Sequence, residues 1–168
     1  EHRLQGHVGI PPASNGDPLQ TYTDSNWGAQ DALRPCENET RSVTLDEYKS
    51  IQGWYITRMG GPLVWGVGRE KKLSGSSCIA EIKSMDKGVK DTQYVRALCN
   101  QMELPDAKET TKLFNDNKGS VDWVHSGCKA TKKLRHKNIS EFRIAEARKD
   151  GDVEIYWTPG KTNPADLF

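Results

Sequence analysis

Two strand-like runs on either side of a short glycine-rich turn constrain the fold of this chain more than any other feature. Residues 53–68 read GWYITRMGGPLVWGVG, in which aromatic and β-branched residues flank Gly60, Gly61 and Pro62. Two such runs joined by so short a turn predict a β-hairpin. Any sheet that this chain builds is therefore antiparallel in at least one part.

The rest of the chain alternates between patterns typical of strands and patterns typical of helices. Residues 19–27, 111–114 and 153–158 are short alternating or apolar runs, as strands require. After potential capping residues at 74–77, apolar residues recur at helical spacing, and residues 139–147 favour a second helix. Residues 117–126 can form a short helix. The apolar residues of the long helix are Ile82, Met85, Val89, Val95, Leu98 and Met102.

Proline and glycine set the expected ends of these helices. Leu104, Pro105 and Asp106 should end the long helix, Gly151 should end the later one, and Asn163 can cap a last helix. The order is then strand, hairpin, helix, strand, helix, helix, strand, helix. Alternation in the second half predicts parallel strands, so we expect an α/β fold with a mixed sheet covered by helices.

Length and composition favour one folded domain. The chain has 168 residues, of which 35% are hydrophobic and 28% charged, so it can bury one core and does not have the profile of a disordered chain. No apolar run approaches the roughly 18 residues of a membrane helix, and the opening lacks a signal peptide's apolar stretch. The four cysteines form no CxxC pair. We therefore expect a soluble, intracellular protein with reduced thiols.

Four acidic residues fall at related places in this pattern. Asp24 lies near the end of a strand, Asp116 where a strand meets a helix, Glu81 in the early turns of the long helix and Asp166 in the last one. Sites in open α/β sheets gather at the carboxyl ends of strands, so these side chains can converge. Clustered carboxylates repel one another, which predicts bound Mg²⁺ or Mn²⁺. Two such ions would suit phosphodiester hydrolysis. Singly, each acid is more often a cap or a solvated turn.

A basic run and a few polar residues are candidates for nucleic-acid contact. Residues 129–137 read KATKKLRHK and could neutralise several phosphates, although a solvated helix flank has the same pattern. Ser76, Ser77 and Asn117 are further candidates, with helix capping as the simpler reading of the serines. The tryptophans could stack bases, but core positions are the more frequent place for strand aromatics. The candidate contacts in the run are Lys129, Lys132, Lys133, Arg135 and His136.

Five segments resemble, in the same order and at similar spacing, the RNase H region of copia-type (Pseudoviridae) retrotransposon polyproteins. They read TYTDSNWGA, GWYITRMGGPLVWGVGREKKLSGSSCIAEIKS, FNDNKGSV, KLRHKNISEFRI and WTPGKTNPADLF, and together they span nearly the whole chain. The opening EHRLQG, followed by GDPLQTYTD, resembles the joint between reverse transcriptase and RNase H. We therefore expect an N-terminal extension over residues 1–18 and an RNase H domain over residues 19–168.

The resemblance implies a fold, a site and an activity. The fold would be the RNase H-like fold, a five-stranded mixed sheet flanked by helices. The family's four metal-binding and catalytic acids match Asp24, Glu81, Asp116 and Asp166 of this sequence. The activity would be endonucleolytic hydrolysis of the RNA strand of RNA/DNA hybrids by two Mg²⁺ ions during reverse transcription. The reverse transcriptase domain of the same polyprotein would be the partner, in cytoplasmic virus-like particles or in the nucleus and without a membrane.

Two departures from related enzymes are visible, and other functions stay open. Many cellular and retroviral RNases H carry a histidine before the last aspartate, whereas residues 157–166 read WTPGKTNPAD. The loop over residues 32–50 is longer than the usual joint. The chain could instead be a domesticated or inactive module that binds nucleic acid or a protein, or a connection that stabilises reverse transcriptase. Integrases of the same broad fold are disfavoured because their acidic triad has a different spacing.

Overall fold

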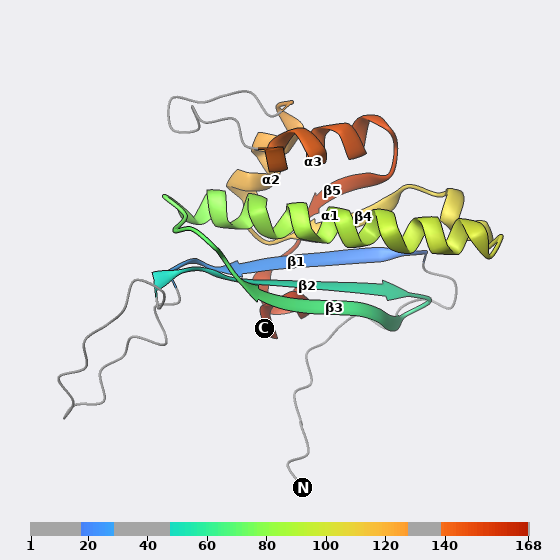
Figure 1. Cartoon of the computed structure of the whole chain (residues 1–168), viewed down its shortest axis with the longest axis horizontal. Helices are drawn as coiled ribbons and strands as arrows, with labels where there is room; N and C mark the ends of the chain where they lie inside the picture. The colour runs from blue at the N-terminus through green and yellow to red at the C-terminus, as the bar shows by residue number, and fades with distance from the viewer. Residues whose placement is uncertain (1–17, 29–47, 128–138, 168) are drawn as a thin grey trace, which may run out of the picture.

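The computed structural model describes residues 18–28, 48–127 and 139–167 of the chain (Figure 1). Its strands are β1 (Gln20–Asn26), β2 (Ile51–Arg58), β3 (Gly61–Arg69), β4 (Thr111–Asn115) and β5 (Val153–Trp157). Its α-helices are α1 (Ser77–Gln101), α2 (Lys118–His125) and α3 (Ile139–Lys149). Three short 3₁₀ helices complete it, namely η3 (Pro105–Lys108), η4 (Gly160–Thr162) and η5 (Pro164–Leu167).

The strands form one mixed sheet in the order β3-β2-β1-β4-β5. The predicted hairpin is present, because β2 pairs antiparallel with β3, and β1 pairs antiparallel with β2 on the other side. The predicted parallel half is also present, since β1 pairs with β4 and β4 with β5 in parallel. The carboxyl ends of β1, β3, β4 and β5 therefore meet at one edge of the sheet. The expected five-stranded mixed sheet with flanking helices is confirmed.

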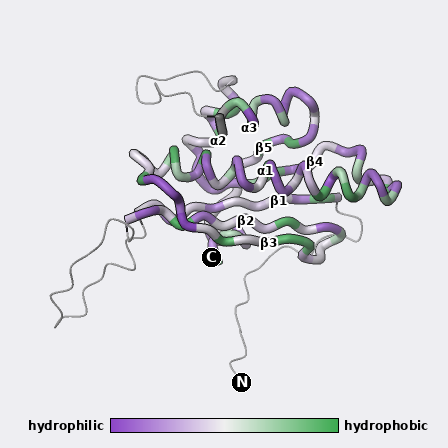
Figure 2. Tube along the Cα trace, in the orientation of Figure 1, coloured by the Kyte–Doolittle hydropathy of each residue, from purple (hydrophilic) through white to green (hydrophobic). Residues whose placement is uncertain are grey.

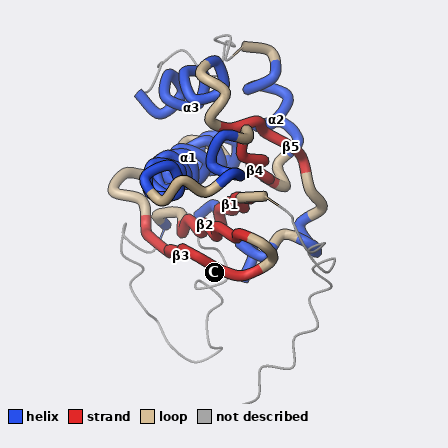
Figure 3. The backbone as a smooth tube through the Cα atoms, turned by 90° about the vertical axis from the view of Figure 1, so that its right-hand side faces the viewer, coloured by secondary structure: helices blue, strands red, loops and turns tan. Residues whose placement is uncertain are grey.

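The three α-helices share one hydrophobic core with the strands (Figures 1 and 3). Ser76 caps α1, where its hydroxyl oxygen accepts a hydrogen bond from the Ile79 amide at 3.3 Å. Hydrophobic and hydrophilic residues are interspersed along α1, as expected for a helix with one face on a sheet (Figure 2). The fully buried Met85 and Val89 of α1 belong to the same cluster as Leu113 of β4.

The end of the long helix differs from the sequence prediction. The long helix ends at Gln101, before Leu104 and Pro105, because Glu103 adopts a positive φ of 55° and the Met102 amide bonds back to the Leu98 carbonyl. Pro105 instead begins η3. Leu98, in the last turn of α1, and Met102, just after it, are exposed rather than in the core. Gly151, with φ of 75°, does end the α3 region as expected.

The prediction that strand aromatics are mainly core residues is wrong for three of the five tryptophans. Trp123 is buried, but Trp27, Trp65 and Trp157 are 42%, 60% and 51% exposed. Trp65 and Trp157 lie on β3 and β5, the edge strands of a sheet of which the α-helices cover one face, and Trp27 lies just beyond the end of β1. An alternating pattern identifies a strand but not which of its faces receives a helix.

Parts of the predicted organisation lie outside the described residues. These parts are the N-terminal extension over residues 1–18, apart from its last residue, and most of the 32–50 loop, so both stay predictions. Within the described residues, no helix is both long and apolar enough to cross a membrane.

Packing of β4 under the helices gives a first prediction. Leu113 is fully buried between the sheet and α1, whereas Leu63 of β3 is 46% exposed. We expect Leu113→Ala to lower the free energy of unfolding by about 2–5 kcal/mol, because it leaves a cavity in the core. The matched change Leu63→Ala should cost less than about 1 kcal/mol. Urea unfolding of both variants measures the difference, and equal losses would contradict this account of the core.

Candidate metal centre

Three of the four predicted acids meet at the carboxyl edge of the sheet. Each of Asp24, Glu81 and Asp116 places a carboxylate oxygen so that these oxygens lie within 4.8 Å of one another. Asp24 comes from β1, Asp116 follows β4 directly, and Glu81 lies in the second turn of α1. The arrangement arises because β1 and β4 are parallel neighbours and α1 begins at the same edge of the sheet.

A buried asparagine, which the sequence analysis did not select, holds this cluster together. Asn115 is fully buried at the end of β4. Its side-chain amide donates to Glu81 Oε2 at 2.8 Å and to the Thr23 carbonyl at 3.2 Å, and its Oδ1 accepts from the Asn117 amide at 3.0 Å. It thus ties β1, α1 and the start of α2 to one side chain. Only its position beside Asp116 could have drawn attention to it.

Burial and mutual repulsion raise the pKa values of all three carboxyls. Burial, followed by the charges of Asp116 and Asp166, raises the pKa of Asp24 from 3.8 to about 7. Burial is also the main cause that raises the pKa of Glu81 from 4.5 to about 8, against the opposing hydrogen bond from Asn115. The pKa of Asp116 is raised by burial and then by Asp166. Near neutral pH the cluster therefore retains protons unless a cation replaces them.

The donor set fits a divalent metal ion. Among the described residues, the ion pairs that lysine and arginine form do not include any of these three carboxylates. The group contains only carboxylate oxygens, which suit Mg²⁺ or Mn²⁺ better than a metal that prefers nitrogen or sulfur ligands. Burial and mutual repulsion disfavour the charged carboxylates in the absence of a cation, and a bound divalent ion would remove that penalty.

Asp166 lies near the cluster but outside the group of three. It is part of η5, and its charge raises the pKa of both Asp24 and Asp116. The expected last α-helix is a pair of 3₁₀ turns within the described residues. Asn163 holds this segment against β1, because its amide donates to the Thr23 carbonyl at 3.0 Å and its Oδ1 accepts from the Ala165 amide at 3.2 Å.

Of the residues predicted to contact nucleic acid, three lie at helix starts and five lie outside the part of the chain that the structure describes. Ser76 and Asn117 are the N-caps of α1 and α2, where each side chain accepts a backbone hydrogen bond. Ser77 is exposed at the first position of α1. The five candidates of the basic run lie outside the described residues and stay predictions, namely Lys129, Lys132, Lys133, Arg135 and His136.

Solved structures share this architecture at low sequence identity. LC11-RNase H1, isolated from compost by a metagenomic approach, superposes with a TM-score of 0.56 at 14% identity over 92% of each chain. The chain has the RNase H fold. No protein-family model and no curated protein matches the sequence.

Two further structures with the RNase H fold agree with this likeness. LC11-RNase H1 in complex with an RNA/DNA hybrid gives a TM-score of 0.55 at 14% identity, over 89% of this chain and 91% of that chain. The N-terminal RNase H domain of rv2228c from Mycobacterium tuberculosis, solved as a fusion with maltose binding protein, gives 0.51 at 11% identity, over 89% and 88%. At such low identities the likeness shows the fold alone.

The raised pKa values predict that the metal-free protein loses stability as the pH rises. Folding favours the protonated forms of Asp24 and Glu81, so this stabilisation is present below about pH 4 and is lost by pH 7–8. After allowance for solvent screening, each carboxyl should contribute roughly 1–2 kcal/mol, or several °C in Tm. Tm measured in EDTA should therefore fall over this range, and Asp24→Asn should flatten the fall.

The exposed Asp122 of α2 supplies the control for this experiment. Asp122→Asn should leave the pH dependence of Tm as in the parent. Mg²⁺ should restore stability at pH 8 to the parent but not to Asp24→Asn. A parent whose Tm rises steadily from pH 4 to pH 8 in EDTA would contradict the electrostatic description of the cluster.

The close approach of Gly160 to Asp116 leads to a second prediction, on the metal affinity of the same site. A Cβ atom at Gly160 would lie 2.8 Å from Asp116 Oδ2, so this carboxylate must move in Gly160→Ala. We expect roughly a 10–100-fold loss of Mn²⁺ affinity, the range seen when groups that orient a metal ligand are disturbed. Gly75→Ala is the control, since its Cβ would meet only Ile79 Cδ1 at 4.0 Å. Calorimetric titration compares the two, and equal affinities would exclude this role for Gly160.

Proposed function

We propose that this chain is an endoribonuclease that hydrolyses the RNA strand of RNA/DNA hybrids with divalent metal ions. The observation that carries the proposal is the cluster of Asp24, Glu81 and Asp116 at the carboxyl edge of a sheet with the RNase H fold. The hybrid bound to a structural neighbour supports the choice of substrate. The five sequence segments that resemble copia-type RNase H regions also support it.

The residues of the cluster would act together to hold metal and position the scissile phosphate. Asp24, Glu81 and Asp116 would be the metal ligands, with Asp166 as a fourth from η5. Two bound Mg²⁺ or Mn²⁺ ions would stabilise charge on the attacking and leaving oxygens of the phosphodiester. Asn115 keeps the Glu81 carboxylate in place, and the Trp157 indole N–H donates to the Asp116 carbonyl at 2.8 Å. The first bond limits the movement of the Glu81 carboxylate, and the second holds the backbone that carries Asp116.

Recognition of the hybrid would depend on its shape and its backbone. An enzyme that cuts many sequences must contact phosphates and sugars, because base contacts would make it sequence-specific. Ser76 and Ser77 at the start of α1 and Asn117 at the start of α2 lie on elements that begin beside the cluster. Lys129, Lys132, Lys133, Arg135 and His136 would add phosphate contacts.

We further propose that the domain belongs to a copia-type retrotransposon polyprotein. Five sequence segments and the opening that resembles a reverse transcriptase joint support this origin. The partner would then be the reverse transcriptase domain of the same polyprotein, and cleavage would occur during reverse transcription, in virus-like particles of the cytoplasm or in the nucleus.

Substitution of the acids tests the proposed activity. We expect Asp24→Asn, Glu81→Gln and Asp116→Asn each to reduce hybrid cleavage by roughly three orders of magnitude, because each removes a charged ligand without changing shape. Asp166→Asn should show a milder loss, since it lies outside the group of three. The assay follows end-labelled RNA in a hybrid with Mg²⁺ or Mn²⁺, with DNA duplex and RNA duplex as substrates that should stay intact.

The outcomes of this assay separate the alternative functions. Asp122→Asn, an exposed acid of α2, should cut at the parental rate. A parent that binds the hybrid but cuts it with neither metal would favour a domesticated binding module. Parental activity in Asp24→Asn or Asp116→Asn would remove that residue from the site.

A further inference from the structure

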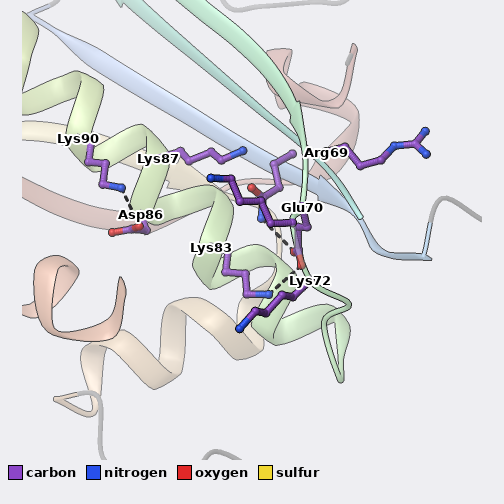
Figure 4. Close-up of a pocket in the computed structure, with 9 residues that line it drawn as sticks. Arg69, Glu70, Lys72, Lys83, Asp86, Lys87 and Lys90 are labelled. Carbon is purple, nitrogen blue, oxygen red and sulfur yellow. Dashed lines mark hydrogen bonds and ion pairs between the residues drawn. The ribbon is translucent and has the colours of Figure 1, made fainter. Parts of the chain in front are cut away.

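A second charged site lies between the end of β3 and the side of α1 (Figure 4). It is a pocket of about 440 Å³, to which residues far apart in the sequence contribute cations. Its two carboxylates, Glu70 and Asp86, are both buried. The six cationic residues that line it are Arg69, Lys71, Lys72, Lys83, Lys87 and Lys90.

Bonds within the protein already occupy the two carboxylates. Glu70 accepts hydrogen bonds from Gln52 at 3.0 Å and from Lys83 at 2.8 Å, and a third from Ser74. Asp86 accepts from Arg143 of α3 at 2.5 Å. Six cationic and two anionic lining residues leave a formal excess of four positive charges. The pocket is therefore suited to an anion with several charges.

One lysine is held in the pocket by the surrounding structure. The Lys87 ammonium lies 5.2 Å from the centre of the Trp54 ring. A Cβ atom on Gly68 would lie only 2.8 Å from Lys87 Nζ, so β3 has a glycine where this lysine crosses it. Burial, and to a smaller extent the charge of Lys90, lowers the pKa of Lys87. A bound anion would reverse this shift.

The pocket and the metal centre share one edge of the sheet. Arg69 of β3 pairs with Ile51 of β2, and Ile51 pairs with Asn26, two residues after Asp24. The backbones of Arg69 and Asn26 are two strand spacings apart, which corresponds to about 10 Å. Along α1, Lys83 follows Glu81 by two residues, and Lys90 lies about 10 Å beyond Lys83 along the helix axis.

These observations favour a chain of phosphates as the ligand. Lysine ammonium groups bind phosphate as point charges. The cations of α1 extend over about 10 Å, which corresponds to about three phosphates of one strand in a duplex. An acidic peptide would also meet positive charge, but the shared edge with a phosphodiester-cleaving centre favours nucleic acid.

We propose that the pocket formed by β3 and α1 binds backbone phosphates of a nucleic-acid strand on its way from the metal centre. The inference rests on the proposed function, because it extends the substrate surface of that site. It adds a phosphate-binding surface that is separate from the basic run over residues 129–137.

Exposed lysines of the pocket allow a test that should not disturb the fold. Lys71, Lys72 and Lys90 are all exposed, and their joint replacement by glutamine removes three charges. Hybrid affinity is measured in EDTA across a salt series, so that cleavage is absent. We expect binding roughly 10–100-fold weaker near 0.1 M salt, with a log–log salt slope flatter by about 2–3. The corresponding arginine triple, which keeps the charge, should bind like the parent.

A matched triple far from the pocket controls for net charge. Lys108, Lys112 and Lys149 are exposed and do not line the pocket, so their replacement by glutamine should leave affinity near the parental value. In the parent, hybrid binding should raise the pKa of Lys87, as followed by NMR. Inorganic tripolyphosphate should compete with the hybrid better than polyglutamate of equal charge.

Three results would overturn the proposal. The first is that replacement of Lys71, Lys72 and Lys90 by glutamine leaves hybrid affinity and salt slope at the parental values. The second is that the control replacement of Lys108, Lys112 and Lys149 weakens binding equally. The third is that polyglutamate competes better than tripolyphosphate, which would indicate an acidic protein as the ligand. Failure of the proposed function is detected separately. A parent that cuts no hybrid with Mg²⁺ or Mn²⁺ removes the enzyme assignment, while the binding series in EDTA still decides whether the pocket holds phosphates.

Discussion

The candidate site depends on a single buried amide. Asn115 connects Thr23 of β1, Glu81 of α1 and the start of α2 by hydrogen bonds. Breaking the bonds of a buried polar group is costly, so these bonds restrict how β1, β4 and α1 are placed relative to one another at this edge. The same Thr23 carbonyl also accepts from Asn163, which brings η5 to the cluster.

Opposite charges gather at two separate places near α1. The carboxylates of Asp24, Glu81 and Asp116 lie close together, whereas the lysines of the pocket form an excess of positive charge between β3 and α1. In the pocket, Gln52, Ser74 and Lys83 all bond to Glu70. The ion pairs that lysine and arginine form among the described residues do not include the three clustered carboxylates, so their charge stays available for a metal ion.

Sequence reasoning could predict the features that depend on local pattern. The hairpin, the cap at Ser76 and the acids at strand ends follow from turn residues, capping preference and the geometry of parallel strands. Asn115 could not be selected, because a buried amide leaves no periodic signal. The exposure of Trp65 depends on which face of the sheet the helices cover. The lysine pocket depends on a contact between β3 and α1. A contiguous basic run is visible in a sequence, whereas cations on two separate elements are not.

Two of the exposed tryptophans have a further consequence. Trp27 follows the strand of Asp24 and donates its indole N–H to the Ser74 carbonyl, while Trp157 donates to the Asp116 carbonyl. Both indoles are therefore held by backbone carbonyls, Trp157 at the cluster itself and Trp27 three residues beyond Asp24, and both remain open to water. Among the five tryptophans of the chain, Trp157 is thus an intrinsic fluorophore in direct contact with a residue of the cluster. Its emission offers an optical readout of whatever displaces water there, without a label.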